Sequence, residues 1–138
     1  MIKKYKARLT TVLVASAIWA SPVLALEDLS TWDESRDITL NTSATGAAVS
    51  DTIVNFPVLI RLGEAEASII AAADNGNSIR FSKTDNVTQL PYEIESWSPT
   101  SAAIWVKVDT ILGNNATQKI RMHWGNELAA NASNGAAV

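Results

Sequence analysis

The stretch of sequence that decides the fold is residues 90–108, LPYEIESWSPTSAAIWVKV. Apolar and polar residues alternate on both sides of Ser98-Pro99-Thr100-Ser101, a pattern typical of a β-hairpin with one dry face and one wet face. If Ile94 and Ile104 both face the core, regular pairing excludes a four-residue loop and requires a loop of three or five residues.

Both registers place carboxylates and an indole together on the outer face of this hairpin. The three-residue loop sets Glu93 opposite Trp105, whereas the five-residue loop sets Glu95 opposite Trp105 and Glu93 opposite Lys107. Exposed indoles beside carboxylates form the usual platform for sugar rings, and packing beneath a second sheet or a neighbouring domain is the competing explanation. The candidate ligand-binding residues are therefore Trp97, Trp105, Glu93, Glu95 and Lys107.

Residues 1–25 have the pattern of a secretory signal peptide. The first eight residues carry four basic side chains and no acid, and residues 9–20 form an apolar run. This run is shorter than the roughly 20 residues that span a bilayer. Small residues precede a cleavage point after Ala25, so we expect an exported protein, periplasmic or extracellular.

The composition excludes several classes of function. Removal of residues 1–25 takes away four of the 11 basic residues and none of the 14 acidic ones, which leaves an acidic chain. Nucleic acid is therefore not an expected partner, since a polyphosphate requires a basic patch. The chain has no cysteine, which excludes disulfides, zinc–thiolate sites, iron–sulfur clusters and thiol catalysis. We expect no cofactor.

The remaining segments complete an all-β pattern. The Ala-rich segment 64–73 begins with acids and predicts one short helix or helical turn. Pro57 places its strand at a sheet edge or bulge, and Trp32 is expected to cover an open edge. The fold class is therefore an antiparallel, jelly-roll-like β-sandwich. The strands expected outside the hairpin are residues 36–41, 53–62, 79–82 and 118–124.

The order of the motifs NFPVLIRL, DNGNSIRF, LPYEIESW, IWVKV and KIRMHWGN resembles the bacterial DUF2341 domain over about residues 32–126. That resemblance implies an exported module without an established activity. It also implies a larger protein, in which a jelly-roll domain or a MotA/TolQ/ExbB-type proton-channel segment follows. We therefore expect a signal peptide at residues 1–25, the DUF2341-like sandwich at 26–126 and a linker-like tail at 127–138 of a truncated chain.

Acid–base chemistry has weak support. Glu93 and Glu95 project from one strand face with Cα atoms about 6.5–7 Å apart, a spacing at which glycoside-cleaving carboxylates work. A domain of this size does not build the deep cleft of such enzymes, so we favour cross-strand pairing with basic residues. His123 lies on the wet face of its strand and is interpreted as a surface residue. The segment 74–77, DNGN, favours a tight turn over a calcium loop, and we expect no metal site.

The sequence thus predicts a non-enzymatic extracytoplasmic recognition or spacer module of a larger cell-envelope protein. A glycan or an envelope protein is the expected partner. The alternative is a carbohydrate-binding module that uses Trp97, Trp105, Glu93 and Glu95, and a weaker alternative is a small glycoside hydrolase that uses the two glutamates.

Overall fold

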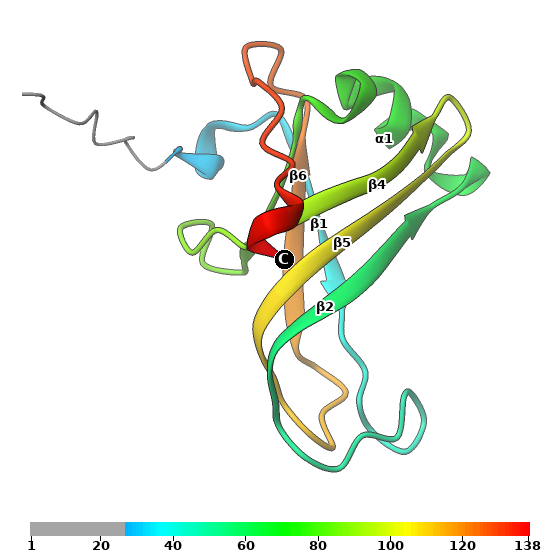
Figure 1. Ribbon diagram of the computed structural model, residues 1–138, viewed down its shortest axis with the longest axis vertical. Helices are drawn as coiled ribbons and strands as arrows, with labels where there is room; N and C mark the ends of the chain where they lie inside the picture. Colours follow the sequence, from blue (N-terminus) through cyan, green and yellow to red (C-terminus); the bar gives the residue numbers. More distant parts are fainter. Residues whose placement is uncertain (1–26) are drawn as a thin grey trace, which may run out of the picture.

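The computed structural model describes residues 27–138, which form two packed three-stranded antiparallel sheets (Figure 1). One sheet has the strand order β1-β6-β3 and the other the order β2-β5-β4. The predicted antiparallel β-sandwich is therefore confirmed, while the predicted signal peptide lies outside the described residues. The strands are β1 (Glu34–Thr39), β2 (Ile53–Leu62), β3 (Ile79–Lys83), β4 (Tyr92–Ser98), β5 (Ser101–Ile111) and β6 (Lys119–Trp124).

The core lies between the two sheets and follows the alternation seen in the sequence. On β5, every second residue from Ala102 to Val108 is buried. On β6, Ile120, Met122 and Trp124 face the same core. Phe81 of β3 meets Tyr92 of β4 edge to face, with ring centroids 5.4 Å apart, so an aromatic pair joins the sheets.

One short helix closes one end of the sandwich, as the sequence predicts (Figure 1). It consists of a 3-10 turn, η2 (Glu64–Glu66), and α1 (Ala67–Ala72), followed by a second 3-10 turn, η3 (Asp74–Gly76). The Gly63 N–H donates to Glu66 Oε2 at 3.1 Å, which satisfies an otherwise free donor at the helix start. Within residues 27–138, no helix is long and apolar enough to cross a membrane.

Strand β2 is an edge strand, because it pairs with β5 alone. Its bounds are those predicted from the sequence. Pro57 is tolerated there because a residue of an edge strand can lack a backbone N–H without breaking a hydrogen bond to a second neighbouring strand. Asn55 has φ of +52°, so the strand is irregular near its start. Val54 and Phe56 beside it are among the most exposed large apolar residues.

The N-terminal segment, residues 27–32, covers the outer face of the β1-β6-β3 sheet. Leu29, in the 3-10 turn η1 (Leu29–Thr31), and Trp32 are buried but lie outside the main core cluster. Arg80 of β3 places its guanidinium carbon 5.2 Å from the centre of the Trp32 ring. Trp32 therefore covers an outer sheet face and packs against a cation.

The buried residues of β5 give a direct test of the fold. Ile104→Ala removes a side chain with 0% exposure and should lower the free energy of unfolding by about 2–5 kcal/mol, because a cavity remains. Val87→Ala, at a position with 60% exposure, should change it by less than about 0.5 kcal/mol. Urea denaturation measures both values, and equal effects would contradict the assigned core.

Candidate functional site

The outer face of the β2-β5-β4 sheet carries a partly exposed indole, that of Trp105. Trp105 of β5 pairs with Leu59 of β2 on one side and with Glu93 of β4 on the other. Its Nε1–H donates to Glu95 Oε2 at 2.8 Å, which fixes the orientation of the ring. The indole stays partly exposed, so this face combines a flat apolar surface with carboxylates.

Trp97 does not lie on this face, and the prediction that both indoles share it was wrong. Ile94 pairs with Ile104, but Ser96 pairs with Ala103, so Glu95 is an extra residue in a β-bulge. The bulge turns Trp97 inward, where it packs against the core. The predicted three- or five-residue loop is also wrong, because Ser98 pairs with Ser101 across a two-residue turn.

Glu93 and Lys107 are partly buried and contact the C-terminal tail. A Cβ built on Gly135 would lie 2.7 Å from Glu93 Oε1, and Lys107 Nζ donates to the Ala137 carbonyl at 3.1 Å. Of the five candidate residues, Trp105 and Glu95 form one hydrogen-bonded pair, Glu93 and Lys107 contact the tail, and Trp97 lies on the other side of the sheet.

The tail itself packs along the free edge of β4, although its composition is that of a linker. The Asn134 N–H donates to the Tyr92 carbonyl, and the Ile94 N–H donates to Ser133 Oγ, both at 2.8 Å. The tail ends in the 3-10 turn η4 (Gly135–Ala137), next to β4 in Figure 1. An edge strand is thereby covered.

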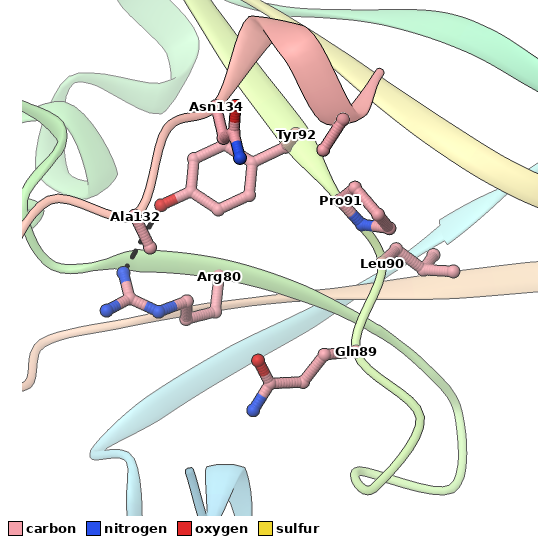
Figure 2. A pocket seen from close by; sticks show the side chains of 8 residues that line it. Arg80, Gln89, Leu90, Pro91, Tyr92, Ala132 and Asn134 are labelled. Atoms are coloured by element: carbon pink, nitrogen blue, oxygen red, sulfur yellow. Dashed lines mark hydrogen bonds between the residues drawn. The ribbon is translucent and has the colours of Figure 1, made fainter. Parts of the chain in front are cut away.

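Two hollows adjoin the tail where it meets the start of β4. The first, of about 230 Å³, lies between Arg80, Gln89, Pro91 and Asn134 and is seen from close by in Figure 2. The second, of about 210 Å³, extends toward Lys107 and Asp109. Residues Gln89, Leu90, Pro91 and Ala137 line both hollows.

Arg80 is a functional candidate that the sequence analysis missed. Its side chain is only 8% exposed, and its Nε–H donates to Glu27 Oε2 at 2.8 Å. Its Nη1 donates to the Tyr92 hydroxyl, at 3.2 Å (Figure 2), and to the Ile79 and Asn77 carbonyls. Its Nη2 donates to the Ala130 carbonyl at 2.8 Å. Arg80 thus joins the N-terminal segment, β4 and the tail. In the sequence, Arg80 lies between two core residues, Ile79 and Phe81. Alternation along the strand therefore places its side chain on the outer face, where an arginine is expected to be exposed to solvent.

His123 is buried, so its interpretation as a surface residue was wrong. It does face away from the main core, but its cross-strand neighbour Arg80 packs against the N-terminal segment, and His123 is only 2% exposed. Its Nε2 lies 2.8 Å from Ser82 Oγ. Burial, and then the charge of Arg121, lower the pKa of His123 from its usual 6.5. This serine–histidine pair is buried at both residues.

The described part of the chain contains no cluster of side chains that could bind a metal ion. Among residues 27–138, no three acidic or histidine side chains are grouped so as to hold a metal ion. The segment at Asp74–Gly76 is a tight 3-10 turn in which all three residues have positive φ.

Residues 75–138 match the family model DUF2341, described as a domain of unknown function. This part of the chain is therefore similar to DUF2341 domains. The resemblance inferred from the motifs is confirmed for these residues, which include β3 to β6, the tail and all five candidate residues. The match does not include residues 32–74, and it extends through the tail. No curated protein and no solved structure matches the chain.

The contacts of Arg80 should be essential to stability. Arg80→Met keeps most of the apolar stem but leaves Glu27 and several carbonyls without their donor, so we expect a loss of about 2–4 kcal/mol. Arg61→Met, the same change on an exposed position of β2, is the matched control and should cost less than about 0.5 kcal/mol. Chemical denaturation checks both, and equal losses would contradict the assigned role.

The buried histidine predicts a pH dependence of stability. Because the pKa of His123 is lower in the folded chain than in the unfolded chain, the unfolded chain binds more protons below about pH 6.5. Stability should therefore fall as the pH decreases from 6.5 toward and through the folded pKa. His123→Gln should flatten this slope above about pH 5, where carboxylates have not yet titrated. Urea midpoints against pH measure it, and an unchanged slope would contradict the assignment.

Proposed function

We propose that the chain is a non-catalytic recognition module that works outside the cytoplasm as part of a larger cell-envelope protein. The observation that carries the proposal is Trp105, a partly exposed indole fixed by Glu95 on the outer face of an antiparallel sheet. The predicted signal peptide supports the location, and the resemblance to ExbB-linked members supports the larger protein.

The arrangement of acid–base groups supports a non-catalytic role. Glu95 is bonded to Trp105, whereas Glu93 faces Gly135 of the tail, so the two carboxylates have different partners. A glycosidase needs two carboxyl groups that flank one bond of the substrate. Ser82 and His123 are buried, so a substrate does not reach that pair without displacing part of the chain.

A glycan is the ligand class that this face fits best. The indole offers a flat apolar surface for a sugar ring, and Glu95 and Glu93 offer acceptors for hydroxyl groups at its margin. Since Trp97 is turned inward, the platform consists of one indole rather than the two expected from the sequence.

Two matched substitutions test this proposal. Soluble β-linked oligosaccharides of glucose and of N-acetylglucosamine should shift the indole N–H signal of Trp105 in ¹⁵N NMR spectra, with the signals of the buried Trp32 and Trp124 unchanged. Trp105→Ala should weaken binding by about tenfold or more, equal to about 1.4 kcal/mol.

Trp97→Phe is the control, because an inward-facing side chain should leave affinity unchanged. Equal losses from both substitutions would support the two-indole platform instead. If no oligosaccharide of either series moves the Trp105 signal, the glycan assignment is wrong.

A further inference from the structure

The tail binds along the free edge of β4 as an irregular segment that ends in a 3-10 turn. We define the tail segment as residues 131–137. One backbone bond joins Asn134 to Tyr92, Ser133 Oγ accepts from the Ile94 N–H, and Lys107 holds the Ala137 carbonyl. These contacts follow the edge of β4 through one backbone bond and two side-chain bonds, and residues 131–137 form no strand there.

At position 135 the tail segment lies against the end of the flexible Glu93 side chain, so a larger residue there would displace the carboxylate. A side chain at position 135 would meet the Glu93 carboxylate, with a built Cβ only 2.7 Å from Oε1 and 2.8 Å from Cδ. Ala132 and Ala137 line the hollows on either side. The sequence Ala-Ser-Asn-Gly-Ala-Ala thus follows this edge with small side chains and through hydrogen bonds.

The tail segment is held without a buried side chain. Every residue from 127 to 138 is exposed or only partly buried, and Leu128 is 96% exposed. Two solvent-open hollows adjoin the segment, and Figure 2 shows the first of them. Release therefore breaks a few polar contacts that water replaces, and it uncovers a sheet edge with free donors and acceptors.

We propose that the edge of β4 docks the tail segment of a second copy of this chain, so that two copies exchange tails. Each copy carries both the edge and a segment shown to fit it, so an exchanged pair is closed and keeps the same contacts. The exchange point lies at Gly125, whose φ is +91°, directly after β6. A copy's own tail has the advantage of high effective concentration, so exchange increases with protein concentration.

This inference does not use the Trp105 ring, and although Glu93 borders both the glycan face and the tail segment, its test requires no glycan. The absence of cysteine from the sequence allows a direct test. One preparation of the chain carries Glu93→Cys and another carries Gly135→Cys. The built Cβ at position 135 lies 2.7 Å from Glu93 Oε1, so a short bismaleimide can span the distance between the two thiols. Glu93→Cys also removes the carboxylate that would meet the new side chain.

The matched control replaces the first preparation with Glu93→Ala combined with Val87→Cys. This control also lacks the Glu93 carboxylate, and its thiol lies at an exposed position in the β3–β4 loop. The Glu93→Cys chain and the control chain are each mixed with the Gly135→Cys chain at increasing concentration. The difference in cross-linking yield separates docking of the tail from random collision. A third chain carries both Glu93→Cys and Gly135→Cys and reports closure within one copy.

Exchange predicts a cross-linked heterodimer about tenfold more abundant with Glu93→Cys than with the control, and a yield that rises with concentration. A yield equal to the control, with the double variant closing within one copy, would show that the tail stays on its own sheet and overturn the proposal. Failure of the double variant to close would also overturn it, because the tail would not lie on β4.

Discussion

The apolar rows of β5 and β6 face each other across the sandwich, and the rest of the structure depends on this contact. Ile104 and Val106 on one strand and Ile120 and Met122 on the other are almost completely buried. Because side chains alternate along a strand, the same packing that holds Ile104 and Val106 inside holds Trp105 and Lys107 outside. The position of the candidate binding face is thus a consequence of the core, and a change of register by one residue would exchange the two.

Periodicity in the sequence was enough to find the strands, the inward residues and the sheet class. The strand at 53–62 has the predicted bounds, and Ile120, Met122 and Trp124 face the core as predicted. The error at Trp97 arose because the pairing argument assumed one residue opposite one residue. A two-residue turn at Pro99-Thr100 is incompatible with an inward Ile94–Ile104 pair unless one strand carries an extra residue. That conflict was present in the sequence, and it is the signature of the bulge at Glu95.

The burial of His123 and Arg80 could not be predicted in the same way. Alternation placed both side chains correctly on the outer side of the β1-β6-β3 sheet. Their burial depends on a segment about 50 to 100 residues earlier in the chain, with Glu27 bonded to Arg80 and Trp32 packed against it. A pattern within one strand contains no information about which distant segment covers it. The same reasoning applies to the tail, whose small polar residues resemble a linker until the edge of β4 is known.

Arg80 connects the two terminal segments, but it does not hold them equally. The N-terminal segment is tied by a short ion pair to Glu27 and by the buried side chains of Leu29 and Trp32. The tail reaches the same guanidinium only through the Ala130 carbonyl and buries no side chain. Apolar burial opposes release far more than exposed hydrogen bonds do, because water replaces the latter. The N-terminal cover therefore belongs to the permanent fold, whereas the edge of β4 is the part of the described chain that can change partners while the sandwich stays intact.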